Sequence, residues 1–286
     1  MTKKWILAVL ALCMLLGGCA HPPSDAGDNS TETTTQTEES VQTEDTLGGP
    51  SVLDDNGDGT IAWFALGDSI TQGYNSYLDS ITGEGKLSLN KERCWATFLA
   101  ASTGWQLNNH GVGGSGFVHK GTVLDKLSAR DHVDTIDFSK AELITIAYGV
   151  NDWKYNDKLG TMGDDIAKGG TFYSNMRYII EKLRKDCPDA EIVVISPLNC
   201  SRYGEAKKNW GLGYSFPRNG TLQDIYDAMK EVCDHYHLPL VDILHNEEIN
   251  SDITNWLPDG VHPSLQKHLR LAQILEEELK KVLPEK

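Results

Sequence analysis

The sequence has no hydrophobic run long enough to span a bilayer comfortably. The longest such run, Trp5–Leu16, has 12 residues, whereas a transmembrane helix needs about 20. Positive charge is also scarce, because 26 Lys and Arg residues stand against 41 Asp and Glu residues. The resulting formal net charge of -15 is unfavourable for contact with a phosphate backbone, so we expect no nucleic-acid partner.

Cysteines are few, and their spacing argues against a zinc site. Six are present, of which four lie beyond residue 60: Cys94, Cys187, Cys200 and Cys233. None of these four forms a C-x-x-C pair, the spacing typical of a zinc knuckle. The run Cys233–His237 holds a cysteine and two histidines, but it straddles a predicted helix end and the next strand, so its side chains should diverge. We expect no metal site, while disulfide pairing stays open.

Residues 1–18 have the features of a secretory signal, since Lys3 and Lys4 precede the short apolar run. The run leads into Leu16-Gly17-Gly18-Cys19, which resembles the lipobox of bacterial lipoproteins. That resemblance implies cleavage before Cys19, lipidation of its sulfur and anchoring to the outer face of the bacterial cell membrane. The alternative is an ordinary cleaved signal peptide followed by an incidental cysteine.

The segment from Cys19 to residue 60 lacks the composition of a folded region. Residues 20–60 contain ten acidic residues, no Lys or Arg and no aromatic residue. Such a segment cannot bury enough apolar surface to fold, so we predict a disordered tether over 19–60. Its end, Asp54–Gly59, begins like a calcium-binding loop, but Ala65 occupies the twelfth position, where a bidentate Glu is needed. We therefore expect an acidic turn there.

Residues 61–286 alternate between predicted strands and helices, and we found no internal repeat. The expected strands cover residues 61–66, 105–108, 143–148, 192–196 and 240–243. The expected helices cover residues 92–102, 122–129, 172–185, 222–235 and 265–282. This alternation predicts one α/β domain with a parallel sheet, right-handed crossovers and helices on both faces.

Four short polar segments each follow a predicted strand. They are Gly67–Ser69, Asn109–Gly114, Gly149–Asp152 and Asp259–His262. The carboxyl ends of parallel strands share one edge of a sheet, where ligands bind, so these segments should meet there. A serine held at such a turn exposes its hydroxyl and can act as a nucleophile. Gly-Asp-Ser alone is also a common loop tripeptide, so the prediction depends on all four segments.

In this order, the four segments resemble the conserved Ser, Gly, Asn and His blocks of the SGNH (GDSL) hydrolase family. The resemblance covers about residues 61–284. It implies a three-layer α/β/α, flavodoxin-like domain with a five-stranded parallel sheet in the order 2-1-3-4-5. It also implies hydrolysis of a carboxylic ester through an acyl-enzyme, with no metal or organic cofactor.

The resemblance assigns a role to each matching residue. Ser69 would be the nucleophile, His262 would take and later return its proton, and Asp259 would hold the other imidazole nitrogen. The oxyanion of the intermediate would be held by the backbone N–H groups of Ser69 and Gly114 and by the side-chain amide of Asn151. Such donors stabilise a developing negative charge without carrying a charge themselves.

Two functions of other classes stay open at this point. Gly111–Gly116 fits the dinucleotide fingerprint G-x-G-x-x-G, but it follows the second predicted strand and not the first. The acids about twenty residues further on, Asp131 and Asp134, lie before the third strand. A dehydrogenase would also leave the Gly-Asp-Ser and Asp-x-x-His segments unexplained. The other alternative is a non-catalytic binding module, against which a complete catalytic set argues.

The substrate is the least defined of these expectations. Members of the resembled family remove acetyl groups from carbohydrates or cleave fatty-acyl lipids and thioesters. For an exported, tethered enzyme, a carbohydrate acetyl esterase is our first expectation, and a lipase, phospholipase or thioesterase is the alternative. Residues 198–220 would form a sugar platform or an acyl slot, unless their aromatic side chains pack on the body: Tyr203, Trp210, Tyr214 and Phe216.

Overall fold

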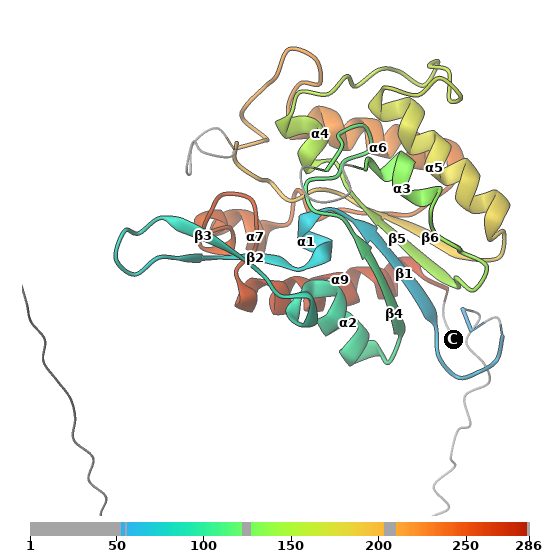
Figure 1. Cartoon of the computed structure of the whole chain (residues 1–286), viewed down its shortest axis with the longest axis horizontal. Helices are drawn as coiled ribbons and strands as arrows, with labels where there is room; N and C mark the ends of the chain where they lie inside the picture. The colour runs from blue at the N-terminus through green and yellow to red at the C-terminus, as the bar shows by residue number, and fades with distance from the viewer. Residues whose placement is uncertain (1–52, 55, 122–126, 203–209, 285–286) are drawn as a thin grey trace, which may run out of the picture. The chain divides into compact units, whose positions relative to one another are not determined.

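A central sheet with helices on both faces forms the core of the domain (Figure 1). The computed structural model describes residues 53–54, 56–121, 127–202 and 210–284. Five parallel strands form the sheet in the order β4-β1-β5-β6-β7. Their bounds are β1 Ala62–Gly67, β4 Gln106–Gly111, β5 Leu143–Ala147, β6 Glu191–Ile195 and β7 Leu240–Val241. This is the expected 2-1-3-4-5 order, so the predicted three-layer fold is confirmed.

The helices divide between the two faces of the sheet (Figure 1). On one face lie α2 Trp95–Thr103 and α9 Leu265–Val282. On the other lie α3 Ala129–Val133, α5 Phe172–Asp186 and α6 Leu222–Tyr236. Shorter helices lie in the connections: α1 Ser69–Gln72, a 3₁₀ turn at Lys91–Arg93, α4 Val150–Lys154, α7 Glu247–Ser251 and α8 Ile253–Trp256.

Strand β1 contributes to both halves of the hydrophobic core. Trp63 and Ala65 pack against the face covered by α2 and α9, whereas Phe64 and Leu66 pack against the face covered by α3, α5 and α6. Successive side chains of a strand point to opposite faces, so a continuous apolar run is what a strand buried on both sides requires. The turn that follows β1 therefore extends from a rigid base.

The long helices begin where the sequence provides caps. The side chain of Thr171 accepts the backbone N–H of Ser174 at the start of α5, and Ser264 does the same for Lys267 at the start of α9. Such caps satisfy backbone donors that have no partner within the helix. Both helices match their predicted ranges to within a residue.

A two-stranded hairpin, β2 Tyr74–Leu78 and β3 Gly85–Leu89, is absent from the sequence prediction. It projects from the body beside α1 (Figure 1). Its outer residues are mostly exposed, so it lacks the buried apolar run that revealed the strands of the main sheet. It also separates β1 from α2, two elements that we had expected to be consecutive.

Two predicted boundaries need correction. The helix expected over 122–129 begins only at Ala129, because Ser128 caps it there; residues 122–126 lie outside the described part. The tether was expected to reach residue 60, but Leu53 is buried, so the fold starts N-terminal to Ile61. Asp54 accepts the backbone N–H groups of Asp58 and Gly59, as an acidic turn would.

The described residues also bear on the cysteines, metals and membrane spans. Within these ranges, four cysteines are free and buried: Cys94, Cys187, Cys200 and Cys233. No group of His, Cys, Asp or Glu side chains in the same ranges is arranged to hold a metal ion. No helix among these residues is both long enough and apolar enough to cross a membrane. Residues 1–18, Cys19 and most of the predicted tether lie outside the described part.

Candidate active site

The side chains of Ser69, His262 and Asp259 form a connected line. Ser69 Oγ lies 2.9 Å from His262 Nε2, and His262 Nδ1 lies 2.7 Å from Asp259 Oδ2. The other carboxylate oxygen of Asp259 accepts the backbone N–H groups of Val261 and His262, which fixes its orientation. In this geometry the imidazole can take the hydroxyl proton while the carboxylate stabilises the resulting charge.

The turn between β1 and α1 positions Ser69. Asp68 is the N-cap of α1, and its Oδ1 accepts the backbone N–H of Ile70 at 2.9 Å. Ser69 is thus the first residue of a short helix that begins directly at the carboxyl end of a buried strand. A sharp strand-to-helix turn of this kind presents the hydroxyl at the edge of the sheet, as the sequence analysis expected.

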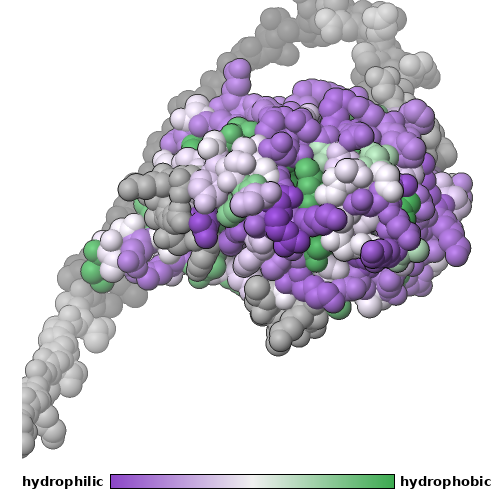
Figure 2. Space-filling model, turned by 90° about the horizontal axis from the view of Figure 1, so that it is seen from above, coloured by the Kyte–Doolittle hydropathy of each residue, from purple (hydrophilic) through white to green (hydrophobic). Residues whose placement is uncertain are grey.

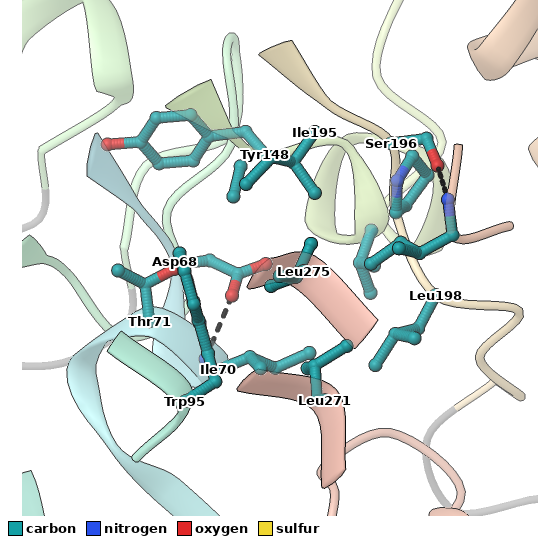
Figure 3. Close-up of a pocket in the computed structure, with 14 residues that line it drawn as sticks. Asp68, Ile70, Thr71, Trp95, Tyr148, Ile195, Ser196, Leu198, Leu271 and Leu275 are labelled. Atoms are coloured by element: carbon teal, nitrogen blue, oxygen red, sulfur yellow. Dashed lines mark hydrogen bonds between the residues drawn. The ribbon is translucent and has the colours of Figure 1, made fainter. Parts of the chain in front are cut away.

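Asp68 lines a small, mainly apolar cavity, into which its carboxyl group points (Figure 3). The cavity has a volume of about 30 Å³ and is lined mainly by hydrophobic side chains, among them Ile195, Leu198 and Leu271. Burial in these surroundings raises the pKa of Asp68 to about 6, although the Ile70 N–H and the charge of His262 oppose the shift. The buried carboxyl group is held in place by its hydrogen bond from the Ile70 N–H, directly next to Ser69 in the chain.

Ser69, Gly114, Asn151 and His262 all line one open pocket of about 290 Å³. Asn151 Nδ2 donates to the carbonyl of Ser115 at 2.9 Å and lies 3.4 Å from Asp68 Oδ2. The first bond orients the amide, and the second is long enough to be exchanged for a better acceptor. The residues that the sequence placed in an oxyanion site are therefore brought together beside the serine.

Gly149 explains why Asn151 faces this pocket. Its φ is 122°, a conformation that residues with a Cβ rarely adopt. Helix α4 starts directly after Gly149, two residues beyond the end of β5, and Asn151 is buried in its first turn. The third polar segment thus reaches the same edge of the sheet as the first.

Asp152 belongs to the third polar segment, but its supporting role was not predicted from the sequence. Its side chain is fully buried and accepts the backbone N–H groups of Phe117, Val118 and His119 at 2.8, 2.7 and 3.2 Å. Burial raises its pKa to about 6, and these hydrogen bonds oppose the shift. Asp152 therefore ties the chain after the second polar segment to the helix that carries Asn151. Its position next to Asn151 was the signal available in the sequence.

The rim of the pocket was also missed. It includes Tyr74 and Leu87 from the hairpin and Lys154 and Tyr155 from the end of α4. The ring of Tyr155 stacks on that of His119, with centroids 3.7 Å apart. Burial lowers the pKa of Lys154, although nearby acidic groups counteract the effect. These residues give the pocket an aromatic and partly cationic mouth.

The aromatic residues expected to form a platform within 198–220 do not line the pocket where they are described. Phe216 packs on Trp153 with ring centroids 5.3 Å apart, and Tyr214 packs on Phe216 at 4.9 Å. Trp210 packs against the hydrophobic core. These three side chains thus pack on the body, while Tyr203 lies outside the described residues.

Comparison with solved structures identifies the fold. A possible lipase from Chitinophaga pinensis is 21% identical, with a TM-score of 0.56 and coverage of 77% of this chain and 98% of its own. A carbohydrate acetylesterase from Sinorhizobium meliloti is 15% identical, with a TM-score of 0.56 and coverage of 78% and 100%. An aryl esterase from M. smegmatis is 14% identical with the same TM-score and coverage.

Sequence comparison identifies the family. A comparison with curated proteins gives no match. Residues 65–268 match the GDSL-like lipase/acylhydrolase family, and this range contains all four polar segments. Because this match covers most of the folded chain, it excludes the two alternative functions, a dinucleotide-binding oxidoreductase and a non-catalytic binding module. The chain belongs to the GDSL-like lipase/acylhydrolase family and is a carboxylic ester hydrolase.

Proposed function

We propose that this protein removes acetyl groups from carbohydrates through an acyl-enzyme formed on Ser69. The observation that carries the proposal is the line from Ser69 Oγ through His262 to Asp259, with distances of 2.9 and 2.7 Å. This line opens into the same pocket as Gly114 and Asn151. A nucleophile, a base and two uncharged donors therefore surround one reaction centre.

The reaction follows from this geometry. Ser69 Oγ attacks the ester carbonyl carbon while His262 Nε2 accepts the hydroxyl proton. The carbonyl oxygen becomes an oxyanion, which receives hydrogen bonds from the backbone N–H groups of Ser69 and Gly114 and from the amide of Asn151. The C–O bond to the alcohol then breaks as His262 returns its proton to the leaving oxygen. A water molecule then attacks the acyl carbon while His262 Nε2 accepts its proton. The bond to Ser69 Oγ breaks, Oγ takes the proton from His262, and the free acid leaves.

The pocket supports a short acyl group. Its lining combines the backbone of Gly113, the amide of Asn151 and the ammonium group of Lys154 with apolar and aromatic side chains such as Leu87 and Tyr155. The apolar cavity beside Asp68, at about 30 Å³, holds only about one or two waters and cannot accept a fatty-acyl chain. A solved acetylesterase that acts on carbohydrates shares the fold, which adds support at the level of architecture.

The acyl preference can be tested with p-nitrophenyl esters that differ only in chain length. We expect kcat/KM to be highest for the acetyl ester and to decline beyond butyrate. Acetate release from acetylated xylan would extend the result to carbohydrate. A preference for octanoyl or longer chains would instead favour a lipase, and a preference for acyl-thiol substrates would favour a thioesterase.

Asn151→Ala should lower kcat by about 10² to 10³, the usual effect of removing one oxyanion donor. KM should change less, because the donor acts mainly on the intermediate. Steady-state kinetics on p-nitrophenyl acetate would measure both constants, and a thermal melt would show whether the fold is retained. A large rise in KM with an unchanged kcat would make Asn151 a substrate-binding residue instead.

We also propose that Cys19 anchors the protein to the outer face of the cell membrane. The support is the lipobox-like Leu16–Cys19 after a short apolar run. Cys19→Ser should release the domain into the medium or leave an unprocessed precursor. Cell fractionation and mass analysis of the mature N-terminus would detect either result. Wild-type protein that is wholly soluble and carries an unmodified N-terminus would contradict the proposal.

A further inference from the structure

The β2–β3 hairpin carries an unusual share of exposed hydrophobic side chains. Among the described residues, eight large hydrophobic side chains are exposed, and five belong to the hairpin or its turn: Tyr77, Leu78, Ile81, Leu87 and Leu89. Figure 2 shows green, hydrophobic atoms on the projection at the left of the view, where the hairpin lies in Figure 1. Such a concentration next to a pocket indicates a contact surface.

The register of the hairpin separates two faces. Paired residues of neighbouring strands share a face, and alternate residues along a strand change face. We define the inner face by the pairs Tyr74–Leu89, Ser76–Leu87 and Leu78–Gly85, and the outer face by the pair Tyr77–Lys86. Tyr74 and Leu87 line the pocket of Ser69. The inner face is therefore the one turned toward the site.

The inner face is also fixed to the loop that carries His262. Ser76 Oγ donates to the His262 carbonyl at 2.6 Å, and the Ser76 N–H donates to the carbonyl of Pro263 at 3.0 Å. A Cβ on Gly85 would lie 2.5 Å from Asp259 Cα, so the two backbones are in direct contact there. The hairpin thus has a defined position relative to the imidazole.

The chemistry of the intermediate determines which part of the ester meets this face. Its central carbon carries Ser69 Oγ, the oxyanion, the acyl group and the leaving oxygen. The oxyanion points to the amide donors, and the leaving oxygen must lie beside His262 Nε2 to receive its proton. The ring of Tyr74 lies next to the His262 ring, with centroids 5.9 Å apart. The alcohol portion of the ester therefore leaves along the hairpin.

We propose that the inner face of the hairpin binds the alcohol portion of the ester, with Leu87 and Tyr74 contacting its carbon framework. This proposal rests on the acyl-enzyme mechanism proposed above. An aromatic ring and a half-exposed leucine suit a cyclic alcohol with an apolar face, such as a pyranose ring. Leu87 is 41% exposed, so it can lose further surface to a bound ring. The hairpin is accordingly a determinant of alcohol specificity and not of acyl specificity.

The test compares two esters that share the acetyl group and differ in the alcohol: an O-acetylated methyl xyloside and ethyl acetate. Leu87→Ser should lower the ratio of their kcat/KM values about tenfold, the scale on which apolar contacts discriminate substrates. Leu87→Met should restore most of the ratio. Tyr77→Ser removes an apolar side chain from the outer face of the same hairpin, and it should keep the wild-type ratio.

A second series uses one alcohol with acetyl, butyryl and hexanoyl groups. Leu87→Ser should keep the wild-type order of acyl preference, whereas an altered order would place the hairpin on the acyl side and overturn the proposal. An unchanged alcohol ratio in an active Leu87→Ser variant, or an equal drop in Tyr77→Ser, would also overturn it. Wild-type protein that releases no acetate from either ester would refute the proposed function itself, and the hairpin proposal with it.

Discussion

Ser69→Ala should abolish ester hydrolysis, with a loss of about 10⁶ in kcat, the scale found when a triad serine is removed. The reason is that Oγ is the attacking atom in the proposed mechanism, and no other hydroxyl is placed beside His262 Nε2 in the described residues. The fold should persist, because the Asp68 cap on α1 uses a backbone N–H and not the serine hydroxyl. Hydrolysis of p-nitrophenyl acetate by purified protein measures the effect.

Covalent labelling strengthens this test. A fluorophosphonate should add one phosphonyl group to the wild-type protein and none to Ser69→Ala, as intact mass would report. Ser139→Ala, at an exposed position, is the matched control and should keep both labelling and turnover. Near-normal hydrolysis by Ser69→Ala would refute the acyl-enzyme mechanism.

Asp259→Asn should lower the maximal rate by up to about 10⁴, the loss known for one protease triad. An amide can hold the imidazole in the wrong tautomer, and it no longer offsets the imidazolium charge. Burial disfavours the charged form of Asp259, but hydrogen bonds and charge from His262 outweigh it and hold the pKa below its usual value. The wild-type carboxylate therefore stays ionised above about pH 4. Its negative charge is lost only as the pH falls through this low pKa.

The same substitution can be made at a second Asp–His pair of this chain. Asp242→Asn is a matched control, because Asp242 also pairs with the histidine three residues later, at 2.8 Å, on the exposed surface. An unchanged rate in Asp259→Asn would leave a Ser69–His262 dyad.

This second Asp-x-x-His pair shows that the catalytic histidine cannot be identified from its spacing to an aspartate alone. Asp242–His245 and Asp259–His262 have the same spacing and the same side-chain pairing. Only His262 contacts Ser69; His245 Nε2 instead lies 2.7 Å from a side-chain oxygen of Gln223. The spacing alone does not separate the two pairs. Their places in the fold differ: Asp242–His245 directly follows β7, whereas Asp259–His262 stands just before α9.

The sheet and long helices could be predicted because burial imposes periodicity on them. Strands β1 and β5 are almost wholly buried, and α5 and α9 combine caps with an apolar stripe. The hairpin carries no such signal, since most of its side chains face solvent. The last strand was predicted over residues 240–243 and is shorter in the structure, where β7 covers Leu240–Val241.

The residues that hold the catalytic groups in place could not be predicted from the sequence, for a different reason. Asp152 bonds to backbone groups more than 30 residues away, and Ser76 bonds to a carbonyl 186 residues away. Nearly every residue carries a backbone N–H and C=O, so the sequence does not show which backbone group a side chain will bond to. The residues that touch the reacting atoms could be assigned by type and order, whereas those that hold them in place required the fold.

The four cysteines among the described residues are buried, so redox partners have little access to their sulfurs in the folded domain. Burial raises the pKa of Cys187 to about 11 and of Cys233 to about 12, and it raises that of Cys200 well above the usual value. The thiolate is the form that attacks disulfides and is oxidised, so these sulfurs are poor partners for either reaction. Stability comes from the two apolar cores on either side of the sheet. Once the domain has folded, burial therefore protects these thiols from disulfide exchange and oxidation.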